Sequence, residues 1–110
     1  MSRIVQEQEL EKALDFLRDN AADIGDAKAR MVKAGHMIKH VEALLFLDSE
    51  QKTVDAKKAE VRTSDRWIDA INEEAEATGE YEKMRALREA AALKIETWRS
   101  EQATFRAMKV

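Results

Sequence analysis

The sequence predicts an all-α protein, built as an elongated antiparallel helical hairpin or three-helix coiled-coil-like bundle. Apolar residues recur every seven positions over long stretches, and this spacing keeps an apolar seam on one side of a helix. Charged residues make up 37% of the 110 residues, aromatic residues only 5%, and the chain has no Pro and three Gly. Such a composition is typical of long helices and disfavours sandwiches and barrels. The length corresponds to a single domain, residues 1–110.

The first helix is predicted at about residues 5–47. Its seam keeps strict seven-residue spacing, and the register passes through Gly25 and Gly35, with a kink allowed between Asn20 and Gly25. A helix of this length would measure about 60 Å, which is why we predict an elongated molecule. The seam residues, to which we assign homo-oligomer contacts, are Leu10, Leu17, Ile24, Met31, Ile38 and Leu45.

A second helix is predicted at about residues 51–77, after a turn near residues 48–51. The side chains of Asp48 and Ser49 are able to cap a new helix. The segment Thr63–Asp65 is a place at which this helix can kink or restart. The apolar series that carries the helix is Leu47, Val54, Val61, Ile68 and Ala75.

The last helix is predicted at about residues 80–108, because Thr78-Gly79 is the strongest remaining break. Its seam comprises Met84, Ala91, Trp98 and Phe105. Since Trp98 shares a heptad position with these apolar residues, we expect it to pack in the core and not to stack on nucleic-acid bases.

Self-association is expected from the amount of apolar surface. The run Ala43–Leu47 is apolar on every side of the helix, so it should be buried by the fold or by another subunit. The seams of three slim helices also exceed what one chain can cover by itself. We therefore predict a homo-oligomer.

Catalytic and cofactor-binding motifs are absent from the sequence. It has no Cys, no Gly-rich phosphate loop and no motif for nucleophilic catalysis, which argues against an enzyme, a cofactor and a thiolate metal site. His36 and His40 lie four residues apart, but no third metal ligand accompanies them, so a solvent-facing role is favoured. No apolar run approaches the roughly 20 residues that span a bilayer. We expect no membrane contact and a cytoplasmic location.

The net charge of −3 conceals strong segregation along the chain. Residues 1–26 carry a net charge of −4 and residues 69–82 carry −6. Residues 27–68 carry +3 and residues 83–110 carry +4. Because local patches set the electrostatic field at contact range, the small overall charge does not exclude a polyanionic partner.

Two basic helix faces are candidate nucleic-acid contacts. They comprise Lys28, Arg30, Lys33, His36, Lys39 and His40 on the first helix, and Arg85, Arg88, Arg99 and Arg106 on the last. The first face has no acidic residue between Asp26 and Glu42, so it can bind phosphates or dock on the acidic 69–82 segment of a neighbouring subunit. The arginines of the last helix can instead pair with glutamates of the same helix.

The last third of the chain contains a specific pattern, Trp98-Arg99-Ser100 followed by Ala103 and Arg106. This pattern, together with Asp55–Trp67, resembles a family of short helical proteins encoded in tailed-phage genomes, in which Tyr is common at the place of Trp67. Those proteins tend to be encoded in replication or recombination modules and are similar in outline to UvsY-type recombination mediators. The resemblance implies an oligomeric protein that binds single strands and helps to load a recombinase in the host cell.

We therefore expect a phage-encoded, non-enzymatic accessory protein that binds single-stranded DNA and assists recombination or replication. Its expected partners are further copies of itself, single-stranded DNA, and a recombinase or other phage or host protein. The alternative is a protein-interaction or structural coiled-coil protein, such as a host-defence inhibitor or virion component, that binds no nucleic acid. A small secreted hairpin of the Trp-x-Gly type is disfavoured, since neither Trp67 nor Trp98 has a Gly two residues later.

Overall fold

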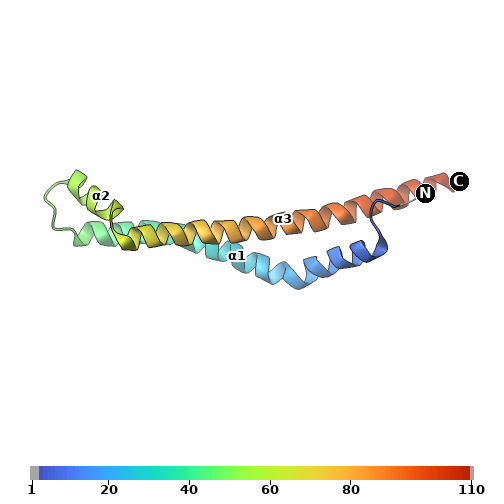
Figure 1. The fold of residues 1–110 in the computed structure, drawn as a ribbon, viewed down its shortest axis with the longest axis horizontal. Helices are drawn as coiled ribbons and strands as arrows, with labels where there is room; N and C mark the ends of the chain where they lie inside the picture. The colour runs from blue at the N-terminus through green and yellow to red at the C-terminus, as the bar shows by residue number, and fades with distance from the viewer. Residues whose placement is uncertain (1–2, 110) are drawn as a thin grey trace. The chain divides into compact units, whose positions relative to one another are not determined.

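The structure, a computed structural model, describes residues 3–109 of the chain. Within these residues the backbone forms α-helices and no strand, which confirms the predicted all-α class. Helix α1 spans Glu7–Asp48, α2 spans Val54–Arg62 and α3 spans Asp65–Met108 (Figure 1). The helix predicted at residues 5–47 therefore agrees closely with α1.

The helices contribute to two compact units, each of which pairs a stretch of α1 with a stretch of α3. The central unit is Asp26–Tyr81 and also contains α2, which lies beside the end of α1 (Figure 1). The terminal unit joins the chain up to Gly25 with the chain from Glu82 onward. In both units the α1 and α3 stretches run in opposite directions, as the predicted antiparallel hairpin requires. The prediction of a single domain stays a prediction.

The heptad seam of α1 faces the inside of the two units. Ile24 is buried together with Ala13, Ala34 and Val41, which occupy positions between seam residues. The remaining seam residues are half-buried: Leu10, Leu17, Met31, Ile38 and Leu45. The seam that we predicted to carry oligomer contacts is thus largely occupied within one chain, because α3 supplies a facing surface in the same hairpin.

Helix α2 begins later and ends earlier than the helix predicted at residues 51–77. Thr53 is its N-cap, and the Thr53 hydroxyl accepts a hydrogen bond from the Ala56 amide at 3.1 Å. At the other end, the Thr63 hydroxyl donates to two carbonyl oxygens of the preceding turn, each at 3.1 Å. Such local bonds compete with continuation of a helix. The chain therefore restarts at Asp65, one of the two outcomes predicted for this segment.

Helix α3 continues through Thr78 and Gly79, so the break predicted between residues 77 and 80 is wrong. Gly79 does not take a positive φ, and a Cβ added there would meet no atom within 4 Å. A Gly costs a helix about 1 kcal/mol relative to Ala. Ala77 and Tyr81, on either side of it, are buried. Tertiary packing on both sides outweighs the local cost.

The apolar series predicted for the second helix is wrong except at Val61. Val61 is buried, whereas the other four residues of the series, Leu47, Val54, Ile68 and Ala75, are exposed. The break at residues 63–64 resets the register, since separate helices begin and end there. After it, the buried or half-buried residues are Trp67, Ala70, Ile71, Glu74, Ala77, Thr78 and Tyr81. The later seam is confirmed, because Ala91 is buried and its other members, Met84, Trp98 and Phe105, are half-buried.

Alanines occupy several of the buried positions of the two long helices. Ala13, Ala34, Ala77 and Ala91 are all buried, whereas no large side chain among the described residues is completely buried. Because the distance between packed helices depends on the side chains at the contact, alanines at these positions allow close approach of the backbones.

We expect Ala77→Leu to destabilise the central unit although it adds apolar surface. Ala77 is completely buried, so the larger side chain must separate the helices or adopt a strained rotamer, at a cost of about 1–3 kcal/mol. Ala75→Leu is the matched control, because it makes the same change at an exposed position of α3, and we expect an effect within about 0.5 kcal/mol. Urea unfolding compares the two variants, and equal midpoints would contradict close packing at Ala77.

Candidate nucleic-acid interface

A row of exposed basic side chains lies on the α1 stretch of the central unit. This basic face consists of Lys28, Lys33, His36, Lys39 and His40, all of which are exposed. None of these side chains forms an ion pair with another residue between 3 and 109. No acidic residue stands between Asp26 and Glu42, so α1 itself offers no carboxylate within the face. The structure thus leaves the positive charge of its lysines available to solvent or to a ligand.

Arg30, predicted as part of the same face, is held by α3 of its own unit. Its guanidinium makes two hydrogen bonds to the Glu73 carboxylate, from Nε to Oε1 at 2.8 Å and from Nη2 to Oε2 at 3.1 Å. Glu76 lies 3.8 Å from the same guanidinium. The acidic 69–82 segment therefore pairs with Arg30 inside one chain, whereas one sequence-based alternative is docking of the basic face on this segment of a neighbouring subunit. This pairing separates Arg30 from the other five residues of the predicted face.

The Arg30–Glu73 contact shifts the titration of both groups. The hydrogen bond from Arg30 holds the pKa of Glu73 below its ordinary value of 4.5, and the same bond raises the pKa of Arg30. Because the folded-state pKa of Glu73 is lowered, the contact adds stability above the ordinary carboxyl pKa. That contribution is lost as the pH falls through the lowered folded-state value.

We expect Glu73→Gln to lower the melting temperature slightly at neutral pH and to have a smaller effect near pH 3. Both side chains are about half-exposed, so the contribution is that of a partly screened surface pair. Asp69→Asn, in the same acidic segment but outside this contact, serves as the control. Thermal unfolding at the two pH values measures the difference, and an equal effect of Glu73→Gln at both would contradict the assignment.

The arginines predicted on the last helix are divided between paired and unpaired residues. Arg85 lies 3.1 Å from Glu89 and 3.5 Å from Glu82, and Arg99 lies 3.0 Å from Glu96. These ion pairs within α3 are the alternative to phosphate binding that the sequence also allows for these arginines. For Arg88 and Arg106, both exposed, the described part of the chain shows no ion pair. The structure does not assemble the four arginines into one unneutralised stripe.

The residues before α1 contact the C-terminal part of α3 in the terminal unit. The backbone amides of Ile4 and Val5 donate to Glu101 Oε1 at 2.9 and 3.1 Å. The Arg3 guanidinium lies 4.4 Å from the centre of the Trp98 ring and 5.5 Å from that of Phe105. Trp98 is thus partly covered by the protein itself, which is consistent with its predicted packing role.

Arg3 is a contact that reasoning from the sequence missed. No periodicity signals it, because it precedes the first helix and its aromatic partners lie near the other end of the chain.

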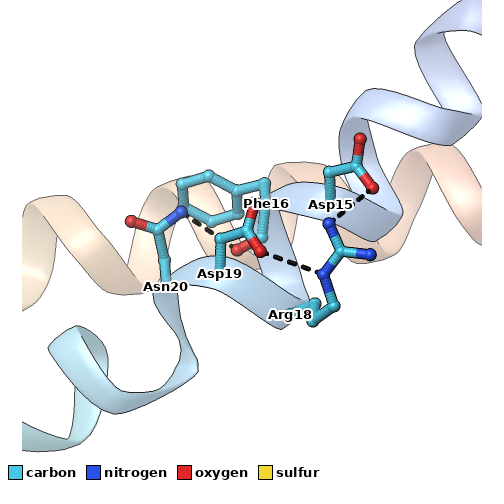
Figure 2. Close-up of polar contacts among 5 residues, drawn as sticks. All are labelled: Asp15, Phe16, Arg18, Asp19 and Asn20. Atoms are coloured by element: carbon cyan, nitrogen blue, oxygen red, sulfur yellow. Dashed lines mark hydrogen bonds and ion pairs between the residues drawn. The ribbon is translucent and has the colours of Figure 1, made fainter.

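The N-terminal stretch of α1 shows how basic residues are neutralised when carboxylates lie nearby. Figure 2 shows Arg18 between Asp15 and Asp19, at 3.2 and 2.9 Å. The hydrogen bond to Asp19, with the negative charges of both carboxylates, raises the pKa of Arg18. In the same view the Asn20 side-chain amide donates to the Phe16 carbonyl oxygen at 3.1 Å (Figure 2). In the basic face, Lys28, Lys33, His36 and His40 have no carboxylate at such spacings along α1. Lys39 has only Glu42, with which it forms no ion pair in the described part of the chain.

His36 and His40 lie on the exposed side of α1. No cluster of three or more His, Asp or Glu side chains with the geometry of a metal site occurs in the part of the chain that the structure describes. Within residues 3–109, none of the helices combines the length and apolar character needed to cross a membrane.

Comparison with family models, with curated proteins and with solved structures finds no match to this chain. The protein is therefore classed by architecture alone. Each of its two units pairs a stretch of α1 with a stretch of α3, and the α1 stretch of the central unit carries a basic face that has no ion pair among residues 3–109.

Proposed function

We propose that this protein binds single-stranded DNA through the basic face and assists recombination or replication as a non-enzymatic accessory factor. The observation that supports the proposal is the basic face itself, which is exposed, lies on a regular helix and has no ion-pair partner among residues 3–109. Lys28 and Lys39 are separated by roughly 16 Å along a helix axis. That spacing allows Lys28, Lys33 and Lys39 to contact several phosphates of one strand.

The proposed mechanism is electrostatic. Lysines that neutralise phosphates release condensed counterions, and this release supplies affinity without reading the bases. Because Arg3 already lies over Trp98, base stacking on this ring is not part of the mechanism. We therefore expect little sequence preference. Few contacts per chain imply weak binding by one copy, which association of several copies would strengthen.

The role in recombination or replication, and a recombinase or other phage or host protein as partner, follow from the resemblance around Trp98 and Arg106. This role and this partner extend the proposal that the protein binds single-stranded DNA, and both depend on that proposal. The host-cell cytoplasm is the corresponding location, since that is where phage DNA is replicated and recombined.

The experiment that tests the proposal is a mobility shift with a fluorescent single-stranded oligonucleotide over a salt series. We expect a shift at about 50 mM salt and micromolar protein, with a log–log salt dependence of about 0.7 per phosphate contact, or about 2 for three lysines. No shift at low salt would overturn the proposal. Binding without salt dependence would overturn the electrostatic mechanism.

A protein-interaction or structural role is the second candidate. The observation that favours it is the exposed apolar surface at the end of α1, where Leu44 and Leu47 remain accessible. This candidate predicts no affinity for nucleic acid even at low salt, so the same mobility shift distinguishes the two.

A further inference from the structure

Apolar residues are exposed where α1 ends and α2 begins. On α1, Leu47 is 77% exposed, and Ala43 and Leu44 are exposed as well. Val54, the first residue of α2, is 57% exposed. A groove between the two helices is lined by Lys39, Glu42, Ala43, Phe46, Leu47 and Lys58. Val54 and Lys58 lie four residues apart and therefore share a face of α2. We call Ala43, Leu44, Leu47 and Val54 the apolar patch.

The hairpin cannot cover this patch by itself. The run Ala43–Leu47 has no polar side at all, so a single packed face leaves other apolar side chains outside. Helix α2 packs against one side, where Val61 is buried and the Lys57 ammonium lies 5.3 Å from the Phe46 ring. Leu47 lines the groove next to Phe46 and still remains largely exposed. The run that the sequence required to be buried is therefore only partly buried by the fold.

Among the described residues, no large side chain is completely buried. This agrees with a core that one chain does not complete.

We propose that two copies of this chain associate through the apolar patch. A second copy presents the same apolar surface, and a two-fold contact requires a patch that complements itself. The rim of the groove carries both signs of charge, with Lys39 and Lys58 beside Glu42, so opposite charges are available to pair across a two-fold axis. The contact differs from the predicted seam Leu10–Leu45, which is used within each chain.

Sedimentation velocity of the full chain without DNA tests this contact. We expect the wild type to sediment as a dimer at micromolar concentration and Leu47→Lys to sediment as a monomer, because two added ammonium groups would face each other in the contact. Lysine is chosen because a cation is tolerated in the last turn of a helix. Helicity measured by circular dichroism should be unchanged, since Leu47 is exposed in the single chain.

Leu93→Lys is the matched control, at a position of α3 that is 68% exposed and outside the patch. It should remain dimeric. A monomeric wild type, a dimeric Leu47→Lys variant, or equal dissociation of both variants would each overturn the proposal. Because no nucleic acid is present, failure here leaves the DNA-binding proposal to its own test.

Discussion

Replacing Val41 with aspartate is expected to lower the free energy of unfolding by about 3–5 kcal/mol. Val41 is 9% exposed and lies on the inward face of α1 in the central unit. A carboxylate there would lose its hydration without gaining a partner, and the apolar contacts of the valine would be lost as well. Domains of this size have a free energy of unfolding of only about 5–15 kcal/mol, so the substitution would remove a large part of it. Urea unfolding followed by circular dichroism measures the change.

Val32→Asp is the matched control for this experiment. It makes the same substitution on the same helix and in the same unit, but Val32 is 47% exposed. Valine and aspartate have similar helix propensities, so the intrinsic effect on α1 is the same in both variants. We expect Val32→Asp to change stability by about 0.5 kcal/mol or less. Equal losses for the two variants would contradict the assignment of Val41 to the inward face.

Replacing Lys28 and Lys33 together with glutamate is expected to abolish the binding of single-stranded DNA. The double variant removes two of the three lysines of the basic face. It also places two carboxylates beside the remaining basic residues of that face. Repulsion of the phosphates then opposes any contact by Lys39. Lys39 itself is left unchanged because it also lines the groove beside the apolar patch. Both substituted residues are exposed, so helicity and sedimentation should stay as in the wild type.

The control for this variant is Lys83→Glu with Lys94→Glu. It produces the same change in net charge at exposed lysines of α3, outside the basic face. We expect binding to weaken modestly, as a change in overall charge requires, and a shift to remain at about 50 mM salt. Loss of binding in both variants alike would show that overall charge, and not the basic face, determines affinity. A protein-interaction role predicts no DNA binding by the wild type, so neither double substitution would change the result of the mobility shift.

Features that depend on residues close together along the chain were predictable from the sequence. The bounds and inward face of α1 follow from an uninterrupted seven-residue repeat, which turns one side of a helix inward whatever the partner is. The basic face was predictable because a stretch without carboxylates offers no pairing within its own helix. Ala91 and Trp98 were predictable for the same reason, because the last helix also has a seven-residue apolar repeat.

Errors arose where local signals were weak and packing decided the outcome. Gly79 favours a break, but its cost to a helix of about 1 kcal/mol is small beside the free energy gained by burying Ala77 and Tyr81. The pairing of Arg30 with Glu73 could not be read from the chain, since 43 residues separate them and several other acidic residues were available. Their contact depends on how α1 and α3 are aligned.

The sequence by itself determined the helical class, the inward face of α1 and the presence of the basic face, because periodicity and charge spacing act over one or two turns. Only the tertiary structure decided that Val61 is buried while Leu47 and Val54 are exposed, and that Arg3 lies over Trp98. These outcomes depend on contacts between segments distant along the chain. The free energy of such contacts exceeds local helix preferences, and the order of residues does not reveal which segments will meet.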